Sequence, residues 1–332
     1  MNLQNIFSNC CNSVAIALAT VILSTWSIGV TAAEMQYPNK SVRWIVPFVA
    51  SGGVDNVVRR VATKLSDRVK VPIVVDNRGG AAGTIGAEIA KSSPADGYTL
   101  LAISSTLAVN QAIRKESSYD LMRDFSPITQ MTTQPYIFTF HSSVPARSIA
   151  ELIALAKSKP NSLNYASSGT GGTQHLAGAM LAKMAGVEMI HVPYKGGGAA
   201  HNDLVAGHIQ IEVTLPISTY EQVKAGRLRY LAVTSLKRLK AFPDIPSVAE
   251  TLPGYEIVAW YGVVAPAKTP PQIVSFLHRE IVEIIQMPEV GGWLTAAGTD
   301  PVGGGSTEFG DFISKEITKW RGVAKLVGLS GS

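Results

Sequence analysis

The sequence predicts an α/β protein of two lobes, each built on a mainly parallel sheet flanked by helices. Three observations support this fold class. Runs of β-branched residues alternate with helix-like segments along most of the chain. An apolar strand, a glycine-rich turn and a helix occur in that order three times, at 44–55, 163–178 and 189–204. A proline-rich segment, AFPDIPSVAETLPGYE, interrupts the alternation and is typical of an irregular crossing between lobes.

The predicted elements follow from local composition in chain order. Short β-branched runs bounded by turns predict strands at 43–48, 72–75, 98–103, 163–166, 188–192, 210–213, 228–234 and 260–265. Apolar residues at helical spacing predict helices at 54–65, from 84 onward, and at 148–158, 174–184, 199–206, 273–286 and 309–326. Crossings near 130–136 and 250–260 then give a first lobe over 34–134, a second lobe over 135–252 and a return segment of the first lobe over 253–332.

The first 33 residues differ from the rest because they contain no charged side chain. Residues 14–26 are mostly apolar, and small residues follow at 30–33, which predicts a secretory signal peptide over 1–33, cut after Ala32 or Ala33. The alternative is a retained membrane anchor, although the apolar stretch is shorter than the ~20 residues that span a bilayer. Both cysteines, Cys10 and Cys11, lie in this segment. We therefore expect a periplasmic chain with no disulfide and no cysteine nucleophile.

Composition restricts the class of partner. The chain has 332 residues, of which 46% are apolar and 16% charged, and a formal net charge of +5. This length accommodates two lobes and a large core. The basic residues are scattered without a nucleic-acid-binding signature, so we expect no nucleic acid partner. The histidines do not follow a zinc-ligand spacing, and no phosphate-binding or dinucleotide-binding loop is complete, so no metal and no cofactor are expected.

The three glycine-rich turns indicate anion binding. Each turn leads into a helix whose first N–H groups lack intrahelical partners and lie at the positive end of the helix dipole. Such a terminus binds carboxylates without any catalytic group. Ser104, Ser105 and Thr106 end another predicted strand, and their hydroxyls can donate to a carboxylate. Ser167 and Ser168 lack a nucleophile elbow and a completing base–acid pair, so we predict that the protein is not an enzyme.

The order of these motifs resembles the solute receptors of tripartite tricarboxylate transporters, the Bug-type periplasmic receptors. The strings YPNKSVRWIVPF, DNRGGAAGTIGA, DGYTLL, SSGTGGTQHLA, VPYKGGGAAHNDL, KAGRLRYLAVTS, FPDIPSVAE, PGYE and WYGVVAPA match that family in order from about Tyr37 to Gly328. The resemblance implies a two-lobe, type II periplasmic-binding-protein fold with the ligand cleft between the lobes. It also implies a monomeric receptor that captures a small carboxylate and delivers it to integral-membrane permease subunits.

The resemblance also implies where the ligand binds. Loops from both lobes are expected to hold it, through Phe48, Ser51, Gly52, Gly53, Val54, Asp55, Ala82, Ser105, Thr106, Ser168, Gly169, Thr170, Gly171, Thr173, His175, Tyr194, Gly196, Gly197 and Thr214. Ser51, Val54, Gly79, Ala199 and Thr214 depart from the family's usual residues. Because Val54 replaces a frequent hydroxyl residue, we hypothesise a ligand with an apolar or aromatic body.

Several alternatives remain open at the level of sequence. Asp55 either lies in the cleft or, as an acid in a first helical turn four residues before Arg59, organises its loop. His175 either reaches the cleft or braces the loop before it. The receptor interpretation competes with a transferase-like enzyme acting on an anionic substrate and with a ligand-sensing input protein for a membrane kinase. Dicarboxylates, tricarboxylates, amino acids and aromatic acids all satisfy the predicted site.

Overall fold

The computed structural model describes residues 37–50, 52–114, 116–194 and 197–329. The predicted signal peptide over 1–33, Ser51 and Gly196 lie outside the described residues. The chain divides into two units, Met1–Asn39 and Lys40–Ser332, and both sheets belong to the second. Within the described part, no helix is both long and apolar enough to cross a bilayer.

A six-stranded sheet forms the first lobe, with the strand order β11-β4-β10-β3-β1-β2. Its strands, in chain order, are β1 (Val42–Val46), β2 (Ile73–Asn77), β3 (Thr99–Ser104), β4 (Phe125–Pro135), β10 (Val258–Pro266) and β11 (Asp300–Pro301). Its helices are α2 (Gly53–Val69), α3 (Thr84–Lys91), α4 (Ser105–Ile113), α9 (Pro271–Gln286), α10 (Pro288–Ala296) and α11 (Ser306–Leu326), with a short 3₁₀ turn η1 (Ala81–Gly83) before α3.

A five-stranded sheet forms the second lobe, with the strand order β7-β6-β8-β5-β9. Its strands are β5 (Ile137–His141), β6 (Asn164–Ser167), β7 (Ile190–Pro193), β8 (Ile211–Thr214) and β9 (Leu228–Val233). Its helices are α5 (Ile149–Ser158), α6 (Thr173–Ala185), α7 (Gly197–Val205) and α8 (Pro216–Lys224), and the 3₁₀ turn η2 (Val248–Glu250) precedes the return to the first lobe. The α/β fold with two sheets flanked by helices is thus confirmed.

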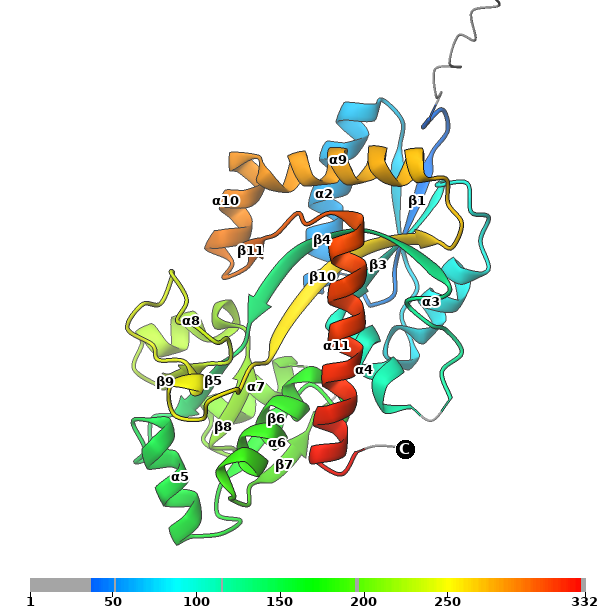
Figure 1. The fold of residues 1–332 in the computed structure, drawn as a ribbon. Coiled ribbons are helices and arrows are strands. Elements are labelled where there is room, and N and C mark those ends of the chain that lie inside the picture. The colour runs from blue at the N-terminus through cyan, green and yellow to red at the C-terminus, as the bar shows by residue number, and fades with distance from the viewer. Residues whose placement is uncertain (1–36, 51, 115, 195–196, 330–332) are drawn as a thin grey trace, which may run out of the picture. The chain divides into compact units, whose positions relative to one another are not determined.

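The prediction of mainly parallel sheets is wrong. Among the described strands, β1 pairs in parallel with β2 and β3, and β6 with β7 and β8. The five other pairs are antiparallel, and they all involve β4, β5 or β10. β4 continues almost directly into β5 of the other sheet, and β10 runs back beside β4 (Figure 1). The chain enters the second lobe along β4 and β5 and returns along β10. Neighbouring strands therefore run in opposite directions in parts of both sheets.

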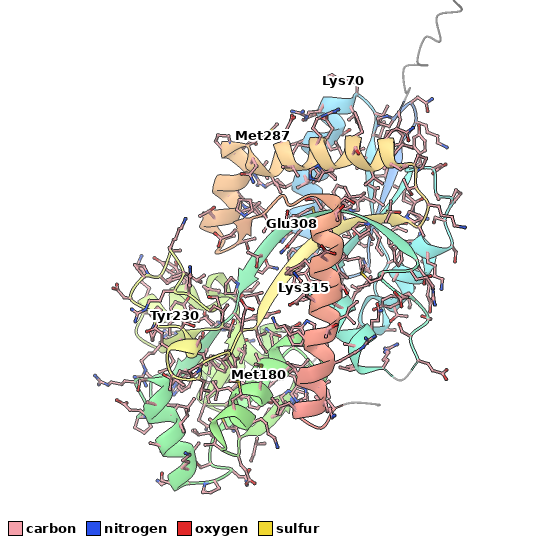
Figure 2. The ribbon with its side chains drawn as sticks, in the orientation of Figure 1. Lys70, Met180, Tyr230, Met287, Glu308 and Lys315 are labelled. Carbon is pink, nitrogen blue, oxygen red and sulfur yellow. The ribbon has the colours of Figure 1, made fainter. Side chains whose placement is uncertain are left out.

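Helix α11 ties the two lobes together. It packs against α4 and β4 and also touches α6 (Figure 1), and Figure 2 shows Glu308 near its start and Lys315 along its length. Buried Glu316 accepts hydrogen bonds from Trp260 Nε1 at 2.9 Å and Trp320 Nε1 at 3.0 Å, which fixes the helix to β10. Because a buried carboxylate is costly unless it is hydrogen-bonded, these two indole donors stabilise the packing.

Candidate functional site

A cavity of about 630 Å³ lies between elements of the two lobes. Its lining residues come from the loop after β1, from η1, from α4 and its C-cap, from the junction of β4 and β5, from the loop before α6 and its first turn, and from the end of the chain after α11. They are Phe48, Ala82, Thr106, Asn110, Ile113, Arg114, Tyr136, Ser168, Gly169, Thr170, Gly171, Gly172, Thr173, Gln174 and Leu329. Its volume falls in the range of sites that enclose a small organic ligand.

One face of α4 forms the first-lobe wall. Thr106, Asn110 and Ile113 lie at positions i, i+4 and i+7, which share one side of the helix, and Arg114 follows directly as its extended C-cap. The helix begins directly where β3 ends at Ser104, and its N-terminus has no side-chain cap. The helix therefore places a hydroxyl, an amide and a guanidinium along the same wall.

Asn110 also connects this wall to the turn that carries Ala82. Its Nδ2 donates to Thr84 Oγ1 at 3.2 Å and approaches the carbonyl oxygens of Ala81 and Ala82 at 3.4 and 3.5 Å. Ala81 and Ala82 have φ values of 47° and 53°, which are unfavourable for residues with a Cβ atom. The amide of Asn110 thus stabilises an unusual turn at the edge of the cavity.

Arg114 gives the cavity its charge. Among the described residues that line the cavity, it is the one with an ionised side chain, and it is half-buried. No carboxylate of the described residues lies within salt-bridge distance of its guanidinium. The cavity therefore has a positive potential that a bound anion would neutralise.

The loop from Ser168 to Thr173 forms the second-lobe wall. Gly169 and Gly171 have φ values of 146° and 77°, which residues with a side chain rarely adopt. The N-cap of α6 is Gly172, which has no side chain that could cap the helix. The first N–H groups of a helix also lack intrahelical partners. These N–H groups and the helix dipole make the wall a binding surface for anionic oxygen.

The two walls meet at Thr173. Its Oγ1 lies 3.5 Å from Ser105 Oγ, and Tyr136 lines the same cavity. Burial raises the pKa of Tyr136 above its usual value, so the phenol stays neutral and keeps its proton for hydrogen bonding. A Cβ atom on Gly171 would lie 3.3 Å from Ile113 Cδ1, which shows how closely the loop approaches α4.

Eight of the predicted site residues line this cavity. They are Phe48, Ala82, Thr106, Ser168, Gly169, Thr170, Gly171 and Thr173. Ser105 is buried beside the cavity against Thr173. Seven lining residues were not predicted individually, namely Asn110, Ile113, Arg114, Tyr136, Gly172, Gln174 and Leu329. Helical spacing from Thr106 is the sequence signal that finds Asn110 and Ile113 on α4, and Arg114 follows as the C-cap of that helix.

The predicted residues of the loop after β1 lie elsewhere, apart from Phe48. Gly52 is the N-cap of α2, and Gly53 lines a second cavity of about 420 Å³ beside Tyr261. Val54 is buried and is not among the residues that line the cavity. Asp55 is also buried and accepts hydrogen bonds from Arg59 Nε and Asn77 Nδ2, both at 2.8 Å. In this structure Asp55 therefore organises its loop.

The other predicted residues of the second lobe that the structure describes do not line the cavity. His175 Nδ1 lies behind the loop and accepts a hydrogen bond from the N–H of Gly171 at 3.1 Å. Tyr194 donates to Asp203 Oδ2 at 2.6 Å, Gly197 begins α7, and Thr214 is buried at the end of β8. In the described part of the chain, no group of three or more metal-ligating side chains comes together.

Known proteins resemble this chain over most of its length. Residues 57–329 match the model of the tripartite tricarboxylate transporter family receptor. A UPF0065 protein from the tcbD-tcbE intergenic region of Pseudomonas sp. strain P51 is 36% identical over 308 residues, which cover 92% of this chain and 90% of that protein. Protein BugT of Bordetella pertussis strain Tohama I is 33% identical over 318 residues, which cover 94% and 97%.

Solved structures also share the fold of this chain. A periplasmic transporter superposes with a TM-score of 0.78 at 35% identity, covering 89% of this chain and 99% of that one. R. palustris Rpa4515 with adipate gives 0.80 at 32%, covering 89% and 100%, and MatC of Rhodopseudomonas palustris with bound malate gives 0.75 at 26%, covering 86% and 99%. These relatives are substrate-binding receptors and not enzymes. The chain belongs to the tripartite tricarboxylate transporter receptor family, whose members have the two-lobe fold of periplasmic binding proteins.

Proposed function

We propose that this chain is a periplasmic receptor that binds a small carboxylate-bearing ligand in the 630 Å³ cavity and delivers it to the permease of a tripartite tricarboxylate transporter. The observation that carries the proposal is the presence of Arg114 and the uncapped N-terminus of α6 on the same cavity. Both favour negative charge, and they belong to opposite walls. An acid held between them would contact both lobes at once.

The energetics of such a site are sufficient for a receptor. Each hydrogen bond to a charged group contributes about 1.5–3 kcal/mol to binding. Three or four such bonds give about 4.5–12 kcal/mol, and association costs at least about 4 kcal/mol. After this cost, the top of the range reaches the ~8 kcal/mol of a dissociation constant of about 1 μM. Backbone N–H groups, Thr106, Thr173 and Arg114 supply enough donors for this number.

The lining favours an acid with an apolar body. Phe48, Ile113 and Leu329 line the same cavity as the polar donors. Rpa4515 was solved with adipate and MatC with malate, so related receptors hold acids of this size. We therefore propose a small acid whose carbon chain lies against these apolar side chains while its carboxylate meets the donors.

Location and delivery complete the proposal. A signal peptide over 1–33 would send the chain to the periplasm, where the related receptors act. The predicted lobe boundaries at 134/135 and 252/253 belong to the proposal too. Predicted contacts from Gly52, Gly53, Tyr194, Gly197 and Thr214 would require the lobes to close further around the ligand. Ligand favours that closure only if it binds the closed form more tightly.

A thermal-shift screen of mono-, di- and tricarboxylates, aromatic acids and amino acids tests this proposal. A ligand at about 100 times its dissociation constant adds ~2.7 kcal/mol to the free energy of unfolding, which gives a clear rise in melting temperature. We expect at least one acid to raise the midpoint, and nuclear magnetic resonance of the same mixture to show no product. If no acid shifts the midpoint, or if the acid is converted, the receptor proposal is wrong.

A further inference from the structure

Two histidine rings stack directly behind the second-lobe wall. His175 of α6 and His191 of β7 have ring centroids 3.7 Å apart and an interplanar angle of 14°. The ring of Tyr165 on β6 lies 5.1 Å from that of His191 and 6.4 Å from that of His175. His175 is buried and His191 is half-buried. The three rings therefore pack against one another, with one side of the pair left open.

Each ring makes a hydrogen bond into the loop. The N–H of Gly171 donates to Nδ1 of His175 at 3.1 Å. His191 Nε2 lies 2.7 Å from Ser167 Oγ, which itself donates to the carbonyl of Gly169 at 3.0 Å and accepts from the N–H of Gly169 at 3.2 Å. The two glycines with positive φ are thus each tied to one histidine, Gly171 directly and Gly169 through Ser167.

The hydrogen bond from Gly171 requires a neutral His175 ring. The contact between His191 and Ser167 does not, because Ser167 Oγ already donates to Gly169, so the ring donates from Nε2 whether or not it is charged. His175 accepts a hydrogen bond at Nδ1, so its proton must lie on Nε2. A proton added at Nδ1 would oppose the N–H of Gly171 and break that bond. A charge on either ring would also face the other ring 3.7 Å away.

The surroundings disfavour a charged pair. Lys183 of α6, Lys325 of α11, Glu188 before β7 and Tyr165 of β6 line the open hollow that contains both rings. Glu188 accepts a hydrogen bond from Asn161 at 2.9 Å. The hollow thus contains two cationic side chains and one anionic side chain, and it gives solvent protons a route to the rings.

We propose that His175 and His191 are positioning residues that hold the Ser167–Thr173 loop in its ligand-binding shape, and that acid weakens ligand binding by protonating His175 at Nδ1. The effect of acid on ligand binding rests on the proposed function. The role of the two histidines in holding the loop follows from the hydrogen bonds and the ring stack alone. The pair would couple the affinity of the receptor to the pH of its compartment.

The direction of the pH effect follows from the burial of the rings. Burial lowers the pKa of His175, and burial together with His175 lowers the pKa of His191 to about 4. A released loop, with histidines near their ordinary pKa of about 6.5, binds protons that the ordered loop does not. The ordered loop is therefore fully favoured above about pH 6.5 and loses stability as the pH falls toward 4.

Amide hydrogen exchange of Gly171 in the full chain, without any ligand, tests whether the histidines hold the loop. The expected result is a protection factor that falls at least about 10-fold between about pH 7.5 and pH 5, since disordering the loop exposes this N–H. In His175→Gln, whose side-chain oxygen can still accept but does not titrate, the protection factor should fall clearly less than in the wild type, since only His191 remains to take up a proton. His175→Leu should lose protection at both pH values, and the matched control His141→Gln should behave as the wild type.

Protection that is constant with pH in the wild type, or that falls equally in His175→Gln, would overturn the proposal. If His175→Gln does not fold, the imidazole titration of wild-type His175 by nuclear magnetic resonance decides instead. A pKa at or above about 6.5 would show that the ring accepts a proton freely in the folded chain.

Calorimetry tests whether acid weakens ligand binding through His175. The ligands are adipate and the acid that gives the largest thermal shift. Affinity should fall about 10-fold more in the wild type than in His175→Gln between about pH 7.5 and pH 5.5, since protonation of the acid itself is common to both proteins. Equal falls in affinity in the two proteins would contradict this effect. If no acid binds, the proposed function is wrong, while hydrogen exchange of Gly171 still tests whether the histidines hold the loop.

Discussion

The two walls of the cavity are built differently. On the first-lobe wall, α4 and its C-cap present side chains, with Thr106 and Asn110 on one face of the helix and Arg114 directly after it. On the second-lobe wall, the loop before α6 presents mainly backbone, and its shape depends on Gly169 and Gly171. A helix face keeps its shape when a side chain changes, whereas a loop at positive φ does not. The comparison indicates that α4 sets which acid binds and that the loop sets whether any acid binds.

The two walls also offer different chemical groups to a ligand, which again indicates that they contribute differently to recognition. Backbone N–H groups select for anionic oxygen and distinguish poorly between acids. A guanidinium adds a charge and a planar fork of donors in one fixed place, which matches a carboxylate in geometry as well as in sign. The walls therefore divide recognition between a general anion site and a selective one.

Removing the charge of α4 should have the largest effect. We expect Arg114→Gln to weaken binding of the best acid in the screen by about 10- to 150-fold, which corresponds to about 1.5–3 kcal/mol for a charge-assisted contact. Isothermal calorimetry measures this change. Arg147→Gln, the same substitution at an exposed arginine outside the cavity, is the matched control. Affinity of Arg114→Gln within about twofold of the wild type would show that α4 does not set the affinity.

Deforming the loop should have the next largest effect. Gly171 has a φ of 77°, and a left-handed conformation costs about 1–2 kcal/mol for alanine. A Cβ atom there would also press on Ile113. We expect Gly171→Ala to weaken every acid that binds by about 5- to 30-fold, as measured by calorimetry across the panel.

Gly186→Ala separates strain from site geometry. Gly186 ends α6 with a φ of 62°, and a Cβ atom added there would meet nothing within 4 Å, so the backbone strain is similar but remote from the cavity. We expect this control to lower the free energy of unfolding and to leave affinity unchanged. Equal losses of affinity in both variants would mean that the loop acts only through global stability.

Loosening the η1 turn should have the smallest effect. Asn110→Ala removes the hydrogen bond to Thr84 and the approach to the carbonyls of Ala81 and Ala82. A lost hydrogen bond costs about 1 kcal/mol, so we expect about fivefold weaker binding by calorimetry. Exposed Asn202→Ala on α7 is the control. If Asn110→Ala instead matches Arg114→Gln, Asn110 contacts the ligand and does more than brace the turn.

Much of the fold could be predicted from the sequence. The strand of Val42–Val46, the helix of Gly53–Val69 and the second-lobe series from Ile149 to Val205 follow from local patterns and lie within a few residues of their predicted ranges. The directions of β4, β5 and β10 could not be predicted, because strand direction depends on how the chain passes between lobes. Helix α4 was also missed, since its sequence STLAVNQAI has no charged face and follows a strand without a turn.

The site could be predicted only in part. Glycine-rich loops are visible in sequence, and Ser168 to Gly171 and Thr173 do lie on the cavity, although ligand contact stays a prediction. Val54 was singled out from its type, but α2 turns its side chain into the core. Arg114 was missed because an isolated arginine has no local signature. It becomes significant only when α4 brings it to the same cavity as Thr106.

The central claim is that one carboxylate ligand is held between both walls. Calorimetry of the best acid in the screen against its amide tests this claim most directly, because the amide keeps the shape and loses the charge. We predict one bound acid per chain and an amide that binds at least about 100-fold more weakly, or about 2.7 kcal/mol. An amide that binds within a few-fold of the acid, or two independent acids per chain, would contradict the claim.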